Sequence, residues 1–361
     1  MPVDPSNLKA IMAASSKKFG EGRVRFGSEV AEIDRISWGS LELDMATWGG
    51  APMGRVIRPW GGKHTAKSLI VWGLVKSAQE HRSDKYPDGL TCVYFNAEGQ
   101  YDPHFTKEFM GVDTDKLVVE EGSIIEEITA KAAAYLDVAH ILIIDSIGHC
   151  QSRAQYELDP AKGATKGARG TQAVAWGQFL KHVIERMDKH ENMIVAIDQV
   201  RTNQTYGQEV ASGSNIWDHC SSMDLHHRKV ANLYQQADGS LGPDRPQKPH
   251  YQTMGQEVLI DGFEIGIEVN KSRVCRPFGK YRGRLGFEDM QWDRNFELKK
   301  VALYLGVVTQ SGAYFSVDGE SKSMHGHKQF DQRLDEDPSL VMKIYGAVDK
   351  YFKDNGYGKV K

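Results

Sequence analysis

The sequence lacks any long apolar run. No stretch approaches about 18 uncharged apolar residues, the length typical of a membrane-spanning helix, so no such helix is expected. The first six residues, Met1-Pro2-Val3-Asp4-Pro5-Ser6, lack the charged-then-apolar pattern of a signal peptide.

Cysteine is scarce, and the four cysteines are far apart in the chain. They are Cys92, Cys150, Cys220 and Cys275. This spacing suits neither a zinc site nor a disulfide framework, so reduced thiols are expected.

An excess of basic charge is absent as well. The 45 Lys and Arg residues against 48 Asp and Glu residues give a net charge of −3, so nucleic-acid binding would have to come from local patches. The 361 residues, 40% hydrophobic and 26% charged, are ordinary for a soluble globular protein. They allow one large domain with small appendages, or two domains, and show no internal repeat.

A glycine-rich segment followed by lysine and serine is the most informative motif. Residues 61–68 read Gly61-Gly62-Lys63-His64-Thr65-Ala66-Lys67-Ser68 and match the phosphate-loop pattern G-x-x-x-x-G-K-[ST], except that Ala66 replaces the second glycine. The stretch 54–60 predicts a strand before it, and 67–75 predicts a helix after it. Backbone N–H groups, the helix N-terminus and Lys67 would then face a nucleotide triphosphate.

Ala66 leaves a second interpretation open. Glycine at this position permits unusual backbone dihedrals, and alanine is the smallest replacement, so the loop could survive with altered turnover. The alternative is a glycine-lysine turn without function.

Short β-rich apolar runs alternate with helical patterns from about residue 35. The runs lie at 56–57, 92–95, 140–144 and 193–197, and residues 124–134 show a helical pattern. Continuous apolar strands separated by helices predict an α/β fold with a mainly parallel central sheet flanked by helices. Residues 229–256 read as a surface hairpin or insertion, and Asp337-Pro338 as the start of a last helix.

Three polar residues follow predicted core strands. Asp145 ends the run 141–144 and would orient Mg²⁺ while Ser68 supplies a hydroxyl ligand; a simple turn-forming aspartate is the alternative. Glu98, after the run 92–95, could polarise a water that attacks a phosphate. Gln199, after the run 193–197, could hydrogen-bond a terminal phosphate.

Several segments together resemble the RecA family of recombinases over nearly the whole chain. In order they are residues 43–46, 52–56, 96–103, 111–113, 144–146, 198–201, 270–273, 277–278, 312–315 and 337–338. The phosphate loop, with a lysine inside it and no glycine before Lys67, is most similar to the T-even-type phage recombinases. The resemblance therefore implies a RecA-type ATPase core and a phage origin, with the bacterial host cytoplasm as location.

The resemblance implies roles for individual residues. The phosphate loop, residues 61–68, would hold ATP, with Lys67 on phosphates and Ser68 and Asp145 on Mg²⁺; Glu98 would activate water and Gln199 would sense the γ-phosphate. Asp102 and Phe105 would lie near the adenine. Lys271 and Arg273 would reach the ATP of a neighbouring protomer, although a solvated strand edge is the alternative for both.

Two polar segments, about 151–172 and 201–216, match the DNA-binding loops of the family. The part 160–182 holds no acidic residue, which suits contact with a phosphate backbone, and the second segment offers hydroxyls, amides and one aromatic ring. Flexible surface loops are the alternative for both. The candidate DNA-binding residues are Lys162, Lys166, Arg169, Gly170, Arg201, Thr202, Gln204, Tyr206, Ser212, Gly213, Ser214 and Asn215.

The resemblance also implies an organisation and a function. Residues 1–34 would form a polymerisation arm, 35–290 the ATPase core and 291–361 a small C-terminal domain, without the acidic tail of some bacterial members. The function would be DNA-dependent ATP hydrolysis, to ADP or AMP, in a helical homo-oligomeric filament. This filament would form on single-stranded DNA and pair it with homologous duplex, with a single-strand-binding protein and a loader as further partners. A hexameric helicase or motor and a hydrolysis-deficient, nucleotide-gated scaffold are the alternatives.

Overall fold

The computed structural model describes residues 5–20, 24–30, 32–158, 170–187, 191–202, 209–212, 215–236, 240–245, 259–288, 290–321 and 323–355. Contacts between residues divide the chain into two compact units, Met1–Asp34 and Arg35–Lys361. The following paragraphs take each unit by itself.

The first unit is built around one helix, α1 (Pro5–Phe19), followed by a short 3₁₀ turn, η1 (Gly27–Glu29). A helix was expected here from residues 8–12. Its last turn carries Lys17 and Lys18, where the helix dipole favours cations. Leu8 and Ile11 are exposed, 45% and 66%, so much of the apolar side of α1 lies open within this unit.

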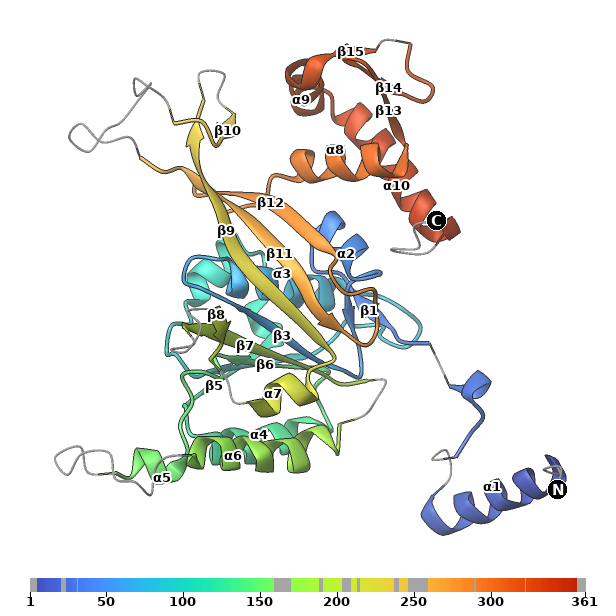
Figure 1. Ribbon diagram of the computed structural model, residues 1–361, viewed down its shortest axis with the longest axis vertical. Coiled ribbons are helices and arrows are strands. Elements are labelled where there is room, and N and C mark those ends of the chain that lie inside the picture. Colours follow the sequence, from blue (N-terminus) through green and yellow to red (C-terminus); the bar gives the residue numbers. More distant parts are fainter. Residues whose placement is uncertain are drawn as a thin grey trace. The chain divides into compact units, whose positions relative to one another are not determined.

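The second unit is organised by a ten-stranded mixed sheet. Its strands run in the spatial order β12-β11-β9-β3-β7-β6-β4-β5, with β8 beside β7 and β10 beside β9 (Figure 1). The strands are β3 (Val56–Gly61), β4 (Cys92–Asn96), β5 (Leu117–Glu121), β6 (Ile141–Asp145), β7 (Met193–Thr202), β8 (Glu209–Ala211), β9 (Met223–Gln235), β10 (Leu241–Gly242), β11 (Gly262–Ser272) and β12 (Lys280–Gly286). β1 (Arg35–Ile36) and β2 (Ala51–Pro52) form a separate pair.

The parallel part of this sheet contains the strands predicted from apolar runs. β5, β4, β6, β7, β3 and β9 are joined by parallel pairings. β11 and β12 instead pair antiparallel, β11 with β9 and β12 with β11. The sequence did not predict this antiparallel end, because buried and half-buried residues alternate along β11 and leave no continuous apolar run. Residues 229–235, expected in a surface hairpin, are the end of β9, which pairs antiparallel with β10.

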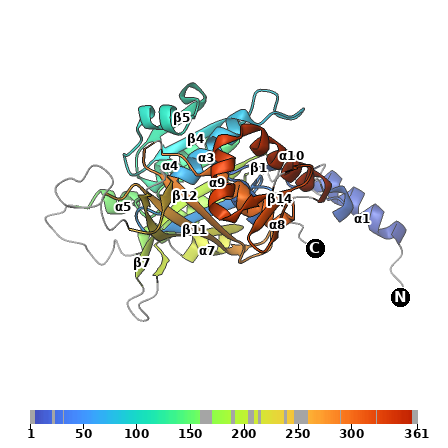
Figure 2. The same cartoon turned by 90° about the horizontal axis from the view of Figure 1, so that it is seen from above.

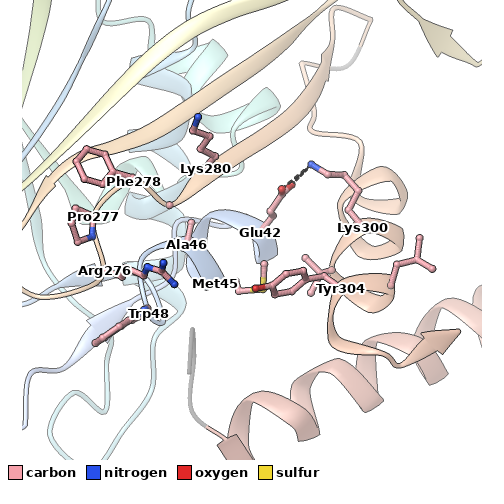
Figure 3. A pocket seen from close by; sticks show the side chains of 13 residues that line it. Glu42, Met45, Ala46, Trp48, Arg276, Pro277, Phe278, Lys280, Lys300 and Tyr304 are labelled. Carbon is pink, nitrogen blue, oxygen red and sulfur yellow. Dashed lines mark hydrogen bonds and ion pairs between the residues drawn. The ribbon is translucent and has the colours of Figure 1, made fainter. Parts of the chain in front are cut away.

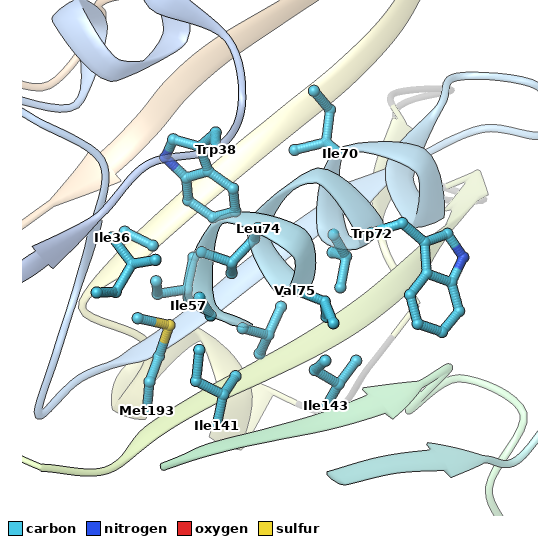
Figure 4. Close-up of a cluster of buried hydrophobic side chains, with 14 of the residues drawn as sticks. Ile36, Trp38, Ile57, Ile70, Trp72, Leu74, Val75, Ile141, Ile143 and Met193 are labelled. Carbon is cyan, nitrogen blue, oxygen red and sulfur yellow. The ribbon is translucent and has the colours of Figure 1, made fainter. Parts of the chain in front are cut away.

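Helices cover both faces of the parallel part. On one face, α3 (Lys67–Glu80) packs Ile70, Leu74 and Val75 against Ile57 and Ile143 of the strands (Figure 4). On the other face lie α4 (Ile125–Tyr135), α6 (Thr171–Phe179) and the π-helical turn η6 (Leu180–Ile184), which bury a second cluster. This doubly covered sheet fixes the ends of the strands, where the predicted site residues lie.

The C-terminal part has a hydrophobic cluster of its own. α8 (Arg294–Leu305), β13 (Val308–Ser311), β14 (Tyr314–Val317), β15 (Met324–His325), α9 (Gly326–Glu336) and α10 (Pro338–Asn355) build it (Figures 1 and 2). Phe315, Phe330 and Ile344 are fully buried in it. As predicted, the last helix starts at Pro338, and Asp337 Oδ1 accepts a hydrogen bond from the Leu340 N–H at 3.2 Å. Among the residues that the structure describes, no helix is long and apolar enough to cross a membrane.

Candidate functional site

The phosphate loop lies between the end of β3 and the start of α3. The Lys67 ammonium donates to the carbonyls of Gly61 and Gly62, at 3.0 and 2.7 Å. The Thr65 hydroxyl donates to the Gly62 carbonyl at 2.9 Å. Burial lowers the pKa of Lys67, and the Asp145 and Glu98 carboxylates oppose that shift. The loop therefore keeps its lysine in place with its own carbonyls, at the N-terminus of a 14-residue helix.

Two positions of this loop are under tight backbone constraints. A Cβ on Gly61 would lie 2.3 Å from the carbonyl oxygen of His227, so only glycine lets β3 approach β9 here. Ala66 caps α3 in the left-handed region, at φ 59° and ψ 27°. Glycine adopts this conformation freely, whereas an L-residue there costs roughly 1–2 kcal/mol. The left-handed conformation explains why glycine is usual at this position, and Ala66 has to adopt the same conformation at a cost.

His227 braces the loop from the neighbouring strand β9. It is buried, and its Nδ1 lies 3.1 Å from the Thr65 carbonyl oxygen, which can only accept, so the ring donates from Nδ1. Burial lowers the pKa of His227 to about 3, which keeps the ring neutral. His227 was not predicted from the sequence, because its place beside the loop depends on the order of strands in the sheet.

Asp145 and Ser68 meet at the edge of the sheet. The Ser68 hydroxyl donates to Asp145 Oδ2 at 2.9 Å, and the Tyr94 hydroxyl donates to the same oxygen at 2.9 Å. Burial raises the pKa of Asp145, and the two hydroxyl groups oppose that shift. Oxygen donors of this kind suit Mg²⁺, which usually takes one or two protein ligands and completes its shell with water and phosphate. Within the described residues no group of three or more His, Cys, Asp or Glu side chains could hold a metal by itself.

Glu98 and Gln199 lie in direct contact. Gln199 Nε2 donates to Glu98 Oε1 at 2.6 Å, and the Ser146 hydroxyl donates to the same carboxylate oxygen. The backbone N–H of Glu98 donates to the Asp145 carbonyl at 3.1 Å, so the ends of β4 and β6 are tied together. A carboxylate that accepts from an amide and a hydroxyl is held in place beside the phosphate loop.

A cavity of about 270 Å³ opens beside this group. Ser68, Glu98 and Asp145 line it, and so do Asp102 and Phe105, the two residues expected near an adenine. Trp72, Tyr94 and Tyr101, whose rings are neighbours in the same lining, were not predicted from the sequence. Tyr94 lies within the predicted strand 92–95 and Tyr101 follows it, whereas no spacing along the chain links Trp72 to them.

Phe105 and Asp102 are themselves engaged. The Phe105 ring stacks on Phe109 with centroids 5.5 Å apart, within a π-helical turn, η2 (Phe105–Phe109). Asp102 accepts the backbone N–H groups of His104 and Phe105 at 2.9 and 3.1 Å. Both side chains therefore shape the wall of the cavity.

Lys271 and Arg273 do not join this group. Ser272 of β11 pairs with Met223 of β9, which pairs with Ile57 near the start of β3, whereas the phosphate loop follows the end of β3. From Ile57 to Gly61, where the loop begins, β3 advances four residues, which is about 13 Å. Within one chain the two cations thus lie at the opposite edge of the sheet from Lys67.

Both cations hold the short helix α7 (Asn215–Cys220). Lys271 Nζ donates to the Asp218 carbonyl, and Arg273 Nη2 donates to the His219 carbonyl at 3.1 Å. Burial lowers the pKa of Lys271, and the Asp224 carboxylate opposes that shift. Both residues thus hydrogen-bond to α7, Arg273 from an exposed position just after β11.

The segments proposed for DNA contact are partly described. Gly170 caps α6 with φ 83°, and α5 (Arg153–Tyr156) occupies the start of the first segment. In the second segment, β7 continues through Arg201 and Thr202 and pairs with β8, so strand residues occupy part of what the sequence suggested to be a loop. The backbone of Asn215 starts α7. Lys162, Lys166, Arg169, Gln204, Tyr206, Gly213 and Ser214 lie outside the described residues.

A larger cavity, about 1020 Å³, lies between α2 (Leu41–Ala46), the turn from β11 to β12, and α8 (Figure 3). Trp48, Phe278 and Tyr304 line it and are exposed, and Lys300 pairs with Glu42 at 2.6 Å. None of the residues predicted for the nucleotide or DNA lines this cavity. Ser68, Glu98 and Asp145 instead line the smaller cavity.

Comparison with known proteins decides the family. The RecA N-terminal domain matches residues 6–245. The chain belongs to the RecA family. This match contains the phosphate loop, Glu98, Asp145 and Gln199, and ends before Lys271 and Arg273.

Curated relatives extend the similarity over most of the chain. The chain is 26% identical over 362 residues to Protein RecA of Methylobacterium radiotolerans, covering 96% of this chain and 89% of the relative. It is 26% identical to Protein RecA of Mannheimia haemolytica, with 95% and 87% covered, and 26% identical to that of Campylobacter lari, with 95% and 92% covered. The RecA-family similarity thus extends beyond residue 245 and includes the end of β11, with Lys271 and Arg273.

Proposed function

We propose that this RecA-family chain is a DNA-dependent ATPase that promotes homologous recombination by strand exchange. The observation that carries the proposal is the convergence of five polar residues at one edge of the parallel strands. These residues are Lys67, Ser68, Glu98, Asp145 and Gln199. Each had been assigned a role in ATP binding or hydrolysis from its place in the sequence, and family membership supports that assignment.

Glu98 is the proposed catalytic base. Its Oε1 is held by Gln199 and the Ser146 hydroxyl, which leaves Oε2 to accept a proton from a water bound in the cavity. A positioned carboxylate of this kind contributes about 10²–10⁴-fold to a hydrolysis rate. The proton stays on Glu98 until phosphate leaves.

Gln199 is the proposed sensor. Its amide now donates to Glu98, and a terminal phosphate within reach would compete for the same N–H group. Because Gln199 lies in the second half of β7 and the second proposed DNA segment begins two residues later, a change in its contacts would reach that segment.

ATP and Mg²⁺ fit the residues present. Backbone N–H groups of the loop and Lys67 would hold the phosphates, and Ser68 with Asp145 would hold Mg²⁺. The bound ion would neutralise charge that develops on the phosphates. Asp102 and Phe105 would lie beside the adenine.

Assembly completes the proposed site. Lys271 and Arg273 lie at the opposite edge of the sheet from Lys67, so they could reach only the ATP of a neighbouring protomer. Cations supplied in trans stabilise transition-state charge, which makes hydrolysis depend on a helical homo-oligomeric filament. α1, with its exposed apolar side chains, is the proposed arm for this contact.

DNA is the proposed polymer that organises the filament. Single-stranded DNA would bind the segments 151–172 and 201–216, and homologous duplex would pair with it. A single-strand-binding protein and a loader are proposed as further partners. A phage origin, of the T-even type, is also proposed, because Lys63 and Ala66 in the phosphate loop resemble those recombinases. The relatives named above are bacterial.

The test is ATP hydrolysis with and without single-stranded DNA. Glu98→Gln should lower the DNA-stimulated turnover at least about 100-fold while a fluorescent ATP analogue still binds. Glu336→Gln is the matched control, because Glu336 is an exposed carboxylate on α9 that accepts a hydrogen bond from Gln332 of the same helix and lies outside the proposed nucleotide and DNA-binding residues. It should keep wild-type turnover.

Two outcomes would count against this function. Equal turnover of Glu98→Gln and wild type would remove Glu98 from the chemistry. Absence of hydrolysis in the wild type, with DNA present, would leave a nucleotide-gated scaffold in place of an ATPase.

A further inference from the structure

A buried cluster of charges lies beside the proposed nucleotide site. Arg58 of β3 is 4% exposed, Asp198 of β7 is 0% exposed and Asp224 of β9 is 8% exposed at the side chain. Arg58 Nη2 donates to Asp224 Oδ2 at 2.7 Å and to the carboxylate of Asp218 on α7. One guanidinium thus faces three carboxylates from two further strands and a helix.

Such a cluster is a poor device for stability alone. Desolvation of buried charges offsets most of their attraction, and apolar residues of similar volume often stabilise a fold as well or better. The three strands of the cluster, β9, β3 and β7, lie side by side in the sheet (Figure 1), so an apolar contact could have joined them. The charges therefore suggest a role beyond packing.

Asp198 joins the cluster to Gln199 and Ser212. Asp198 Oδ1 accepts the backbone N–H of Gln199 at 2.8 Å and the hydroxyl of Ser212 at 2.7 Å. The backbone N–H of Ser212 donates in return to the Gln199 carbonyl at 2.7 Å. The residue next to the proposed sensor thus holds the far end of the second proposed DNA segment.

The turn that leads from β6 to the first proposed DNA segment passes the same point. Gly148 in this turn is so close that a Cβ there would lie 2.6 Å from the Ser212 hydroxyl and 3.4 Å from Asp198 Oδ1. Backbone that leads into the first segment therefore meets Ser212 of the second segment at Asp198.

Arg58 has an unused donor that faces Asp198. Its Nη1 is buried, has no hydrogen-bond acceptor among the described residues, and lies 3.8 Å from Asp198 Oδ2. A shift of about 1 Å at Asp198 would bring these two atoms to hydrogen-bonding distance. We take the present arrangement and this closer one as the two states that a coupling element requires.

We propose that Arg58 and Asp198 are positioning residues that couple the nucleotide contact of Gln199 to the segment ending at Ser212 and to α7. Through Asp218 the same cluster reaches α7, whose carbonyls hold Lys271 and Arg273. The inference rests on the proposed function, because it assumes that ATP and DNA affect each other's binding.

The test measures a coupling ratio. The dissociation constant of a fluorescent oligo(dT) is measured without nucleotide and again with a non-hydrolysable ATP analogue. The coupling ratio is the dissociation constant without nucleotide divided by the dissociation constant with the analogue. Asp198→Asn keeps an oxygen acceptor for Gln199 and Ser212 but removes the charge that faces Arg58. It should lower the ratio about tenfold, within the usual range of allosteric coupling, while affinity for the analogue alone changes less than about twofold.

Glu297→Gln is the matched control. Glu297 is a buried carboxylate that accepts hydrogen bonds from Ser40, Leu41 and Tyr281, none of which belongs to the cluster. The same acid-to-amide change there should lower the melting temperature and leave the ratio unchanged.

Ser212→Ala provides a second, milder variant should Asp198→Asn fail to fold. If Ser212 only touched DNA, its loss would weaken binding equally in both states and preserve the ratio. A lowered ratio supports the proposal.

Two results would overturn the inference. A wild-type ratio in either folded variant removes the coupling role and leaves the proposed function intact. If the nucleotide did not change the DNA affinity of the wild-type protein, both the proposed function and this inference would be contradicted.

Discussion

Ala66 is the residue at which this phosphate loop departs most from its pattern. It adopts φ 59°, a conformation that glycine enters freely and other L-residues avoid. Flanking contacts hold it there: His227 on the Thr65 carbonyl and Lys67 on the carbonyls of Gly61 and Gly62. The loop keeps the shape of a glycine loop because its neighbours impose that shape.

Ala66→Gly should therefore be neutral or stabilising, by up to about 1 kcal/mol in urea unfolding, because relief of strain outweighs the greater freedom of the unfolded chain. Ala130→Gly is the control, at an exposed position inside α4. It should destabilise by about 1 kcal/mol. Equal destabilisation by both changes would show that Ala66 is not strained.

Residues that end apolar strands were the ones that sequence reasoning could find. Asp145, Glu98 and Gln199 each come at or just after such a run, and parallel strands bring their carboxyl ends to one edge of the sheet. Their catalytic roles stay predictions. Arg58 and His227 were not found, because their contacts depend on which strands are neighbours and no spacing along the chain encodes that order.

At the scale of elements, α3 presents the loop to the site. Leu74 is fully buried in the core beneath α3 and sets how that helix, which begins at Lys67, lies on the sheet. The position of Lys67 and Ser68 thus depends on packing two turns further along.

Leu74→Ala should lower the free energy of unfolding by about 2–5 kcal/mol, because the cavity it leaves adds to the lost transfer energy. Val138→Ala, at a side chain that is 68% exposed, should change it by less than about 0.5 kcal/mol. Urea denaturation of both variants measures the difference. A cost below 1 kcal/mol for Leu74→Ala would mean that α3 is not fixed by this contact.

The parallel strands and their helices were predictable as elements, since continuous apolar runs mark strands that are buried on both faces. β11 and β12 were not, because half-exposed strands mix charged and apolar residues, as in Glu264-Ile265-Gly266-Ile267. β7 was predicted to end at Gln199 but runs to Thr202, where pairing with β8 extends it. Such tertiary pairing overrides the local pattern.

At the scale of the whole molecule, the proposed site is divided between two edges of one sheet. Glu98 and the phosphate loop lie at one edge, and Lys271 with Arg273 lies at the other. A single chain cannot bring these groups onto one nucleotide without disrupting the pairing of β9 with β3 and β11. Head-to-tail contact between copies would join them, and such contacts build filaments when the rotation does not close.

Mixing two inactive variants tests this central claim most directly. Glu98→Gln lacks the proposed base but keeps both cations, and a variant with Lys271→Ala and Arg273→Ala has the reverse defect. In an equimolar mixture on single-stranded DNA, random neighbours should restore roughly a quarter of the wild-type sites, and hydrolysis should return to about that fraction. A mixture as inactive as its components, with both variants still binding DNA together, would contradict a site shared between protomers.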